Sequence, residues 1–164
     1  MVQPPSARML PLMAETVAFS LKHVASGGIP FTALIVGETG EILGRGVNRV
    51  IECHDPTAHA EVEAIRNACR SGRTPHLQGA TLLASGEPCA MCYLSALYAG
   101  ISHIYYAVDR HAAADHGFDY RGSYRLLETD PRTWASPRAR ELAVPDRLAP
   151  FEAYQRGSRR AAGR

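Results

Sequence analysis

The stretch ATLLASGEPCAMCYLSALYAGISHIYYAV, residues 80–108, decides the fold class of this chain. The apolar run Ala80–Ala84 predicts a buried strand, and Pro88 fits the first position of a helix that ends near Gly100. Ile101–Val108 is rich in β-branched and aromatic residues, which predicts a further strand. A helix that connects two strands indicates a right-handed parallel crossover. The expected class is therefore α/β.

The residues before this unit predict a helix and a β-hairpin. Leu10, Met13, Val17 and Leu21 recur every three to four positions, which is typical of the buried face of an amphipathic helix over residues 7–24. Two strands at 31–36 and 41–48 flank a turn with two glycines, so we expect them to be antiparallel neighbours.

A second helix is expected between the hairpin and Ala80. His54–Ala58 is predicted to be a loop, with Thr57 as the N-cap of a helix from about Ala58 to Arg70. Beyond Asp109 the pattern is weaker: a short helix is expected over 111–116, either a strand or a helix over 124–127, and a last helix over 150–156.

Length and composition agree with one globular domain. The chain has 164 residues, 46% of them hydrophobic and 21% charged, and a net charge of +2. We expect a single domain over 1–156, with a C-terminal lid or swapped region at 109–156 and a disordered basic tail at 157–164. No stretch is apolar enough for a membrane span and no signal peptide is visible, so a cytoplasmic location is expected. The small net charge weighs against a nucleic-acid partner.

Two short segments, His59-Ala60-Glu61 and Pro88-Cys89-Ala90-Met91-Cys92, supply ligands for a metal ion. Cysteines at i and i+3 share one side of a helix, and in an opening turn the helix dipole favours the thiolate that a metal requires. Residues two apart on a helix point in nearly opposite directions. His59 and Glu61 can therefore serve one pocket only if that pocket lies at the tip of the helix.

The chemistry expected of such a site is hydrolytic deamination. One imidazole and two thiolates leave the fourth position of a zinc ion open, which is the catalytic arrangement. Such a zinc activates water as a nucleophile at neutral pH, and Glu61 could move a proton from that water to a ring nitrogen and then to the departing amine. Backbone N–H groups near Cys89 and Ala60 are candidates to orient the substrate. A redox cysteine pair and a non-catalytic zinc-stabilised domain, in which Glu61 would be incidental, are the alternatives.

The chain resembles the cytidine deaminase-like superfamily, and more closely its purine branch of guanine deaminases and tRNA adenosine deaminases. The segments that carry the resemblance are Pro30-Phe31, Gly46-Val47-Asn48, Asp55–Val62, Glu87–Cys92 and Tyr105–Ala107. Residues 113–119 and 148–154 are similar to the later segments of bacterial guanine deaminases. The Gly-Ala-x-Gly-Ser segment expected of a tRNA-editing enzyme is missing from the sequence after the fourth predicted strand.

This resemblance implies a three-layer α/β/α fold with a mixed five-stranded sheet and helices on both faces, one zinc ion per subunit, and a homodimer that could be domain-swapped. It implies that Asn48 hydrogen-bonds a purine and that Phe31 stacks on it. In the family pattern Gly-Phe-Asp-Asp, this chain has Tyr120 in place of the second aspartate. The further candidate substrate contacts are His116, Phe118, Asp119, Tyr120 and Tyr154.

The resulting hypothesis is a zinc-dependent aminohydrolase that acts on guanine or on a related aminopurine, nucleoside or aminotriazine. Deamination of adenosine in tRNA, and of cytosine or cytidine, are the alternative activities.

Overall fold

The computed structural model of this protein describes residues 8–130, 133 and 149. The chain divides into two compact units, Met1–Glu128 and Thr129–Arg164. The helices and strands given below belong to the first unit. The helix expected at 150–156 and the tail expected at 157–164 lie outside the described residues, and the proposed single domain with a lid stays a prediction. None of the helices in the described part combines the length and apolar character needed to cross a bilayer.

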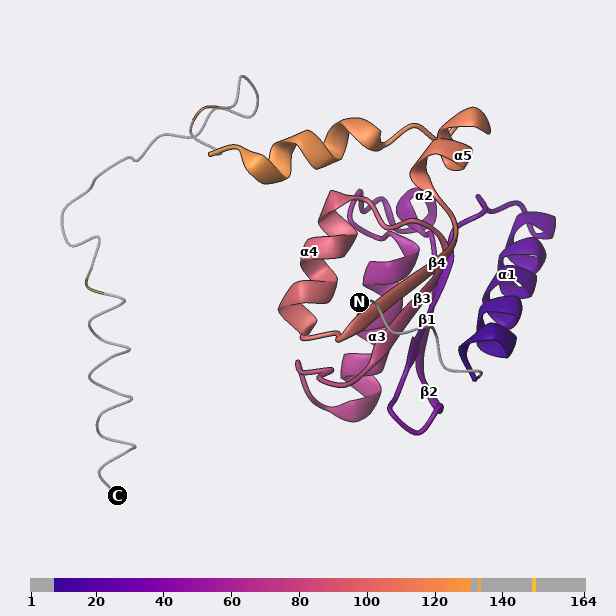
Figure 1. Ribbon diagram of the computed structural model, residues 1–164, viewed down its shortest axis with the longest axis vertical. Helices are drawn as coiled ribbons and strands as arrows, with labels where there is room; N and C mark the ends of the chain where they lie inside the picture. The colour runs from indigo at the N-terminus through magenta and orange to yellow at the C-terminus, as the bar shows by residue number, and fades with distance from the viewer. Residues whose placement is uncertain (1–7, 131–132, 134–148, 150–164) are drawn as a thin grey trace. The chain divides into compact units, whose positions relative to one another are not determined.

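A mixed sheet forms the middle layer of the first unit (Figure 1). Its four strands are β1 (Thr32–Val36), β2 (Ile42–Val47), β3 (Thr81–Gly86) and β4 (His103–Val108), in the spatial order β2-β1-β3-β4. β1 is antiparallel to both β2 and β3, whereas β3 and β4 are parallel. The predicted hairpin and the predicted parallel crossover are both confirmed.

The expected fifth strand is not found among the described residues. After β4 the chain turns into α5 (Arg110–Asp115) and then into the 3-10 helix η1 (Arg121–Glu128). The turn occurs at Asp109, whose side chain accepts hydrogen bonds from the backbone N–H groups of His111 and Ala112 and so caps α5. The segment 124–127, for which a strand or a helix was expected, is part of η1.

Helices cover both faces of the sheet, as expected. The helix α1 (Met9–Ala25) lies on one face, and α3 (Ala60–Gly72) and α4 (Ala90–Ala99) lie on the other (Figure 1). Side chains of β1 alternate between these two layers, since Ala33 and Ile35 join the core beneath α3 and α4 while Leu34 and Val36 join the core beneath α1. The remaining helix, α2 (Val50–Cys53), is a single turn that the sequence analysis did not predict.

The helix α1 is confirmed, but of the four residues predicted to form its buried face only Met13 packs against the core of the sheet. Leu10, Val17 and Leu21 are 68%, 45% and 72% exposed. The side chains that α1 presents to the sheet are those of Met9, Leu12, Met13 and Phe19, with Thr16 and Ser20 buried between them. Thr16 can be buried because its polar groups are hydrogen-bonded. Its hydroxyl donates to the Leu12 carbonyl, and its carbonyl accepts from the Thr32 hydroxyl.

The close packing of α3 on β2 fixes where the beginning of α3 lies. A Cβ atom at Gly46 would be 2.0 Å from the carbonyl oxygen of Ala60, and one at Gly44 would be 2.4 Å from that of Ala64. Only glycine permits this approach without a shift of backbone. The first turn of α3 is thereby held against the end of β2, which is where the candidate site lies.

Candidate active site

Two helix tips meet at the candidate site, and each begins with a predicted metal ligand. His59 is the N-cap of α3 and Cys89 is the N-cap of α4, both with extended backbone (φ −70°, ψ 155° and φ −70°, ψ 173°). The predictions of Thr57 as an N-cap and of Pro88 inside its helix are therefore wrong. The Thr57 hydroxyl instead donates to the carboxylate of Asp55 over 2.6 Å, so it is engaged in the preceding loop.

The three predicted ligand atoms form a regular triangle. The distances between His59 Nδ1, Cys89 Sγ and Cys92 Sγ are each 3.6 Å. A triangle of this size is one face of a tetrahedron whose centre lies about 2.2 Å from each corner, which matches the bond lengths of zinc to nitrogen and sulfur. These three residues could therefore hold a metal ion, and the fourth corner of the tetrahedron has no ligand in this group.

Glu61 stands beside this triangle at the second position of α3. Its side chain is buried, and its Oε2 lies 3.4 Å from the sulfur of Cys92. Burial raises the pKa of the Glu61 carboxyl above its usual range, because the charged form loses contact with water. A carboxyl group whose protonated form is favoured in this way is suited to accept a proton and to return it.

The electrostatics of the thiol pair favour one thiolate even without a metal. The hydrogen bond from the Cys92 thiol, assisted by His59, lowers the pKa of Cys89 to about 4. The same interaction raises the pKa of Cys92, since that thiol holds the shared proton. A hydrogen bond with Cys89 raises the pKa of His59 in turn. Binding of a divalent metal would displace these protons, as is usual for sites with Cys and His ligands.

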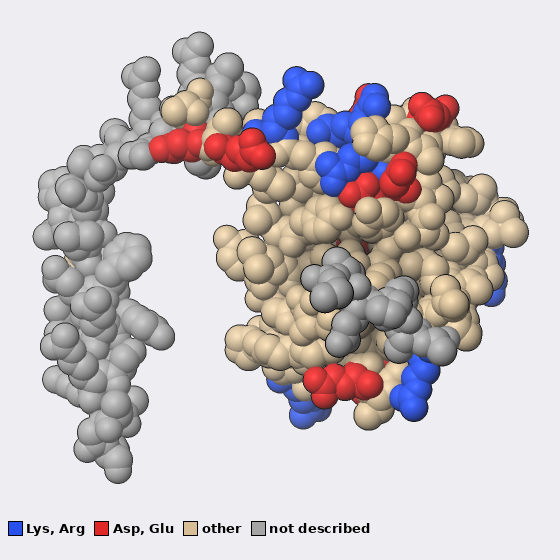
Figure 2. Space-filling view, in the orientation of Figure 1, with Lys and Arg blue, Asp and Glu red and all other residues tan. Residues whose placement is uncertain are grey.

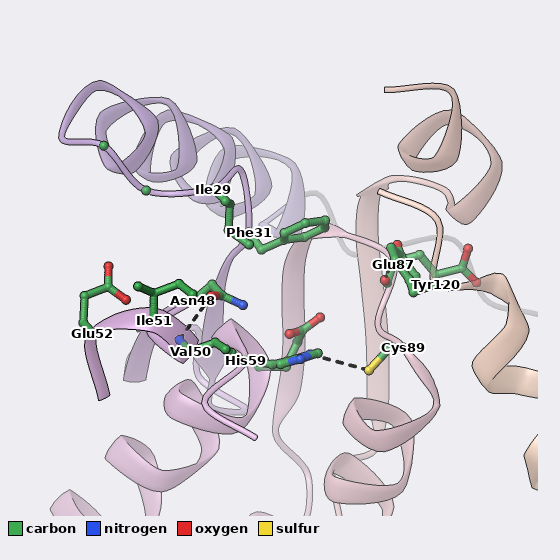
Figure 3. Close-up of a pocket in the computed structure, with 13 residues that line it drawn as sticks. Ile29, Phe31, Asn48, Val50, Ile51, Glu52, His59, Glu87, Cys89 and Tyr120 are labelled. Carbon is green, nitrogen blue, oxygen red and sulfur yellow. Dashed lines mark hydrogen bonds between the residues drawn. The ribbon is translucent and has the colours of Figure 1, made fainter. Parts of the chain in front are cut away.

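A pocket of about 530 Å³ opens onto the metal-binding group. His59, Glu61 and Cys89 contribute to its wall, together with Phe31 and Asn48 (Figure 3). The side-chain oxygen Oδ1 of Asn48 accepts a hydrogen bond from the backbone N–H of Val50, and the side-chain nitrogen Nδ2 is directed toward the space between Phe31 and His59 (Figure 3). Asn48 can therefore offer hydrogen-bond donors to a ligand.

Aromatic rings form another wall of the pocket. The Phe31 ring meets Tyr120 edge-on, with ring centroids 6.2 Å apart, and both residues line the pocket. A Cβ atom at Gly86 would lie 2.6 Å from the Phe31 ring, so the absence of a side chain at Gly86 is what lets the ring take this position. The Tyr120 hydroxyl donates to the carbonyl of Glu87.

Among the described residues, the other predicted substrate contacts are not part of the pocket lining. Ala60 is buried in the core, and Phe118 packs edge-on against Phe31 at 5.1 Å without lining the pocket. Asp119 is exposed and paired with Arg121, and the exposed His116 donates from Nδ1 to the Ala112 carbonyl. Tyr154 lies outside the described residues.

The sequence analysis missed several residues that line the pocket. These are Gly27, Gly28, Ile29, Val50, Ile51, Glu52 and Glu87. Glu87 is buried, and its carboxylate is paired with the Arg110 guanidinium at 2.5 Å. Figure 2 shows the acidic and basic side chains that reach the surface on one face of the molecule. The position of Glu87 directly before the Pro-Cys motif could have drawn attention to it. The residues of α2 gave no such signal, because a four-residue helix has no detectable periodicity.

Comparison with known proteins relates this site to deaminases. Residues 8–108 match the family model described as the cytidine and deoxycytidylate deaminase zinc-binding region. Guanine deaminase of Bacillus subtilis (strain 168) is 35% identical over 142 residues, which cover 87% of this chain and 89% of that protein. The tRNA-specific adenosine deaminase of Haemophilus influenzae is 31% identical over 120 residues, covering 72% of this chain and 69% of the relative.

Two solved structures of guanine deaminases are similar to this chain. The X-ray structure of the Bacillus subtilis guanine deaminase superimposes with a TM-score of 0.79 and 33% identity, covering 88% of this chain and 91% of that one. A structure of guanine deaminase from Nitrosomonas europaea has a TM-score of 0.63 at 24% identity, with 93% and 74% coverage. The second comparison shows likeness of fold alone.

Proposed function

Because the chain belongs to the cytidine and deoxycytidylate deaminase family, whose members share a zinc-binding region, we propose that it deaminates a free purine base by hydrolysis, guanine being the first candidate. The observation that carries the proposal is the shared pocket. Its wall joins the metal-binding residues His59 and Cys89 and the proton carrier Glu61 to an aromatic ring and an amide that can hold a flat heterocycle.

The roles of the residues follow from their positions. Zinc held by His59, Cys89 and Cys92 would supply the Lewis acidity that activates water at neutral pH. The Glu61 carboxylate takes a proton from the attacking water and delivers it to a ring nitrogen of the base. Once the water oxygen is bonded to the ring carbon, its remaining proton passes through the same carboxyl to the amino group. The carbon–nitrogen bond then breaks, and ammonia departs and leaves a carbonyl on the ring.

Two side chains are proposed to hold the base. The Phe31 ring packs on the face or edge of the heterocycle, and the Asn48 amide donates to a ring nitrogen or carbonyl oxygen. The pocket of about 530 Å³ is large enough for a nucleobase, and a nucleoside or an aminotriazine is also of suitable size. Guanine is placed first because a guanine deaminase is 35% identical over most of both chains.

Adenosine in tRNA is the second candidate, because tRNA-specific adenosine deaminases are also among the relatives. The smaller ring of cytosine or cytidine is the third candidate, since the description of the family model names cytidine. These candidates undergo the same deamination step. They differ in the size of the ring and in the groups attached to it, which the pocket must also accommodate.

Ammonia release from a substrate panel tests the proposal. The panel contains guanine, guanosine, adenine, cytosine, cytidine, an aminotriazine and an RNA stem-loop with adenosine in its loop. We expect turnover of guanine above the others and loss of turnover in Glu61→Gln. Glu15→Gln is the control, because Glu15 lies on α1 and pairs with Arg45 at the surface. Equal activity of Glu61→Gln and the wild type would refute the mechanism.

The remaining outcomes of the panel separate the alternatives. Turnover of the RNA alone would replace guanine by adenosine in tRNA as the substrate. If the protein binds zinc but releases ammonia from none of these compounds, the result would favour a non-catalytic zinc-stabilised domain. The cytoplasmic location and the homodimer stay predictions, which cell fractionation and solution molecular mass can test.

A further inference from the structure

We propose that Tyr120, Ser123 and Tyr124 are positioning residues that hold the turn carrying the Cys89 ligand. We refer to residues 87–90 as the ligand turn. The three side chains come from one short stretch of chain at and within η1, and each bonds to a backbone group of the ligand turn. The inference rests on the metal site described above, but not on the identity of the substrate.

Three hydrogen bonds connect the two segments on both sides of Cys89. The Tyr120 hydroxyl donates to the Glu87 carbonyl over 2.7 Å, and the Tyr124 hydroxyl donates to the Pro88 carbonyl over 2.6 Å. On the helical side of the ligand, the backbone N–H of Ala90 donates to Ser123 Oγ over 3.3 Å. The hydroxyl groups therefore engage the turn immediately before and immediately after the cysteine.

The ligand turn needs partners from outside because regular structure ends there. The N–H of Glu87 bonds to the Val108 carbonyl as the last link to β4, and Pro88 has no N–H to donate. Intrahelical bonding resumes only at the Cys89 carbonyl, which accepts from Tyr93. The side chains of Glu87 and Pro88 are buried, so the two tyrosine hydroxyls replace partners that water would otherwise provide.

Side-chain contacts form a second connection between the ligand turn and η1. The Glu87 carboxylate accepts hydrogen bonds from the backbone N–H and the guanidinium of Arg110. The Arg110 guanidinium lies over the Tyr124 ring, 3.5 Å from its centroid. Tyr124 is thus fixed at both ends: its ring lies against the guanidinium that pairs with Glu87, and its hydroxyl bonds to Pro88.

The family model gives these three residues no role, since its matched region ends at residue 108. Tyr120 also lines the pocket, whereas Ser123 and Tyr124 do not. The contact of Ser123 with the site therefore runs through the ligand turn, whereas Tyr124 also contacts the Tyr120 ring, with ring centroids 6.4 Å apart. Groups that orient metal ligands typically change metal affinity by 10–100-fold when they are removed.

Tyr124→Phe and Ser123→Ala test the inference, because each removes a single hydroxyl and leaves the rest of the side chain. Zn²⁺ affinity is measured by competition with a chromophoric chelator, and the geometry of the site by the absorption spectrum of the Co²⁺-loaded protein. We expect at least about tenfold weaker Zn²⁺ binding in each variant and altered Co²⁺ bands. Tyr98→Phe is the matched control, since Tyr98 is on α4 and 85% exposed, and it should match the wild type.

A merely structural role would give a different pattern. Both variants would then lower the melting temperature of the metal-free and loaded protein alike, with unchanged Zn²⁺ affinity and Co²⁺ spectrum, and the inference would be overturned. If Tyr124→Phe does not fold, Ser123→Ala decides by the same criteria. A wild-type chain that binds neither ion would also overturn it. None of these readouts uses a substrate, so a wrong substrate proposal would leave the result intact.

Discussion

The backbone N–H of Asn48 donates to the carbonyl of Phe31 over 3.1 Å, one position beyond the last paired residues of β1 and β2. The proposed donor to the substrate and the proposed aromatic contact are therefore neighbours across a hairpin. Their separation is set by the antiparallel ladder rather than by a loop. A site built in this way is pre-organised, because the two side chains project from backbone that the sheet already holds.

Asn48→Asp should weaken substrate binding without loosening the fold. The aspartate oxygen can still accept from the Val50 N–H, but the two amide donors are lost. Loss of one such hydrogen bond is expected to lower kcat/KM about tenfold or more. Asn67→Asp is the matched control, since Asn67 donates to the Arg45 carbonyl at the surface. A fall of equal size in both variants would contradict a binding role for Asn48.

Gly86→Ala should disturb the pocket through Phe31. The new methyl group would lie 2.6 Å from the ring, which must then move, so KM is expected to rise several-fold while the circular dichroism spectrum is retained. Gly122→Ala is the control, because its added methyl group would meet nothing within 4 Å. In the double variant with Phe31→Leu the two effects should be less than additive. Full additivity of the two effects on KM would show that Gly86→Ala acts through a residue other than Phe31.

Removal of the metal should lower the unfolding temperature as well as the activity. Zinc at one hundred times its dissociation constant stabilises a folded chain that binds it by about 2.7 kcal/mol. We expect one zinc per chain by elemental analysis, and a zinc-dependent rise in melting temperature that is absent in His59→Ala. His76→Ala, which replaces an exposed histidine, should respond like the wild type. An undiminished response in His59→Ala would refute His59 as a ligand.

Arg110→Ala should destabilise the fold more than removal of other arginines. It leaves the buried Glu87 carboxylate without its guanidinium, and breaking a buried pair costs about 3 kcal/mol of unfolding free energy. Arg121→Ala removes an exposed ion pair with Asp119 and should cause no measurable change. Denaturant unfolding of both variants measures the difference. Equal stabilities would mean that Glu87 is satisfied by its other partners.

The cap at Asp109 should give a pH-dependent contribution to stability. The N–H groups of Ala112 and His111 hold the pKa of this carboxyl below its usual range. A carboxyl with a lowered pKa in the folded state stabilises the fold above its unfolded pKa of about 3.9, and this stabilisation is lost as the pH falls through the folded pKa. Asp109→Asn still caps the helix but does not titrate there.

The melting temperature of the wild type relative to Asp109→Asn should therefore decrease between pH 6 and pH 2. A difference that does not change with pH would exclude the ionised carboxylate as the cause. The overall unfolding of both proteins in acid is shared and cancels in this comparison.

The four strands, the helices α1, α3 and α4 and the metal-binding group could be predicted from the sequence because their signals are local. In the strand-helix-strand unit around Cys89, the spacing of apolar residues and the residue composition are compatible with few other structures. The prediction that His59 and Glu61 share a pocket only at a helix tip agrees with the start of α3 at Ala60. Local signals also placed the hairpin of β1 and β2 correctly.

The orientation of α1 could not be predicted, because two of its stripes are apolar. Leu10, Val17 and Leu21 have perfect helical spacing, yet the sheet selects the stripe that contains Met9, Leu12 and Phe19. That choice depends on contacts with β1 and β3, which no local pattern reveals. The caps were misplaced for a related reason: His59 and Cys89 occupy positions that Ser, Thr, Asp or Asn favours by propensity.

The side chains that line the pocket were harder to predict than the orientation of α1 or the helix caps. Glu87 and Tyr120 come from segments more than thirty residues apart and meet because β3, α5 and η1 converge. The hydroxyl groups that bond to the ligand turn have no motif of their own.

The two helix tips that carry His59 and Cys89 are 30 positions apart along the chain. A metal held between them would act as a removable cross-link that closes this loop. Such a link reduces the entropy of the unfolded chain, as a disulfide of the same span does, but it can form without an oxidant. Loading with metal then selects for correctly folded chains, since only in those do the two tips meet.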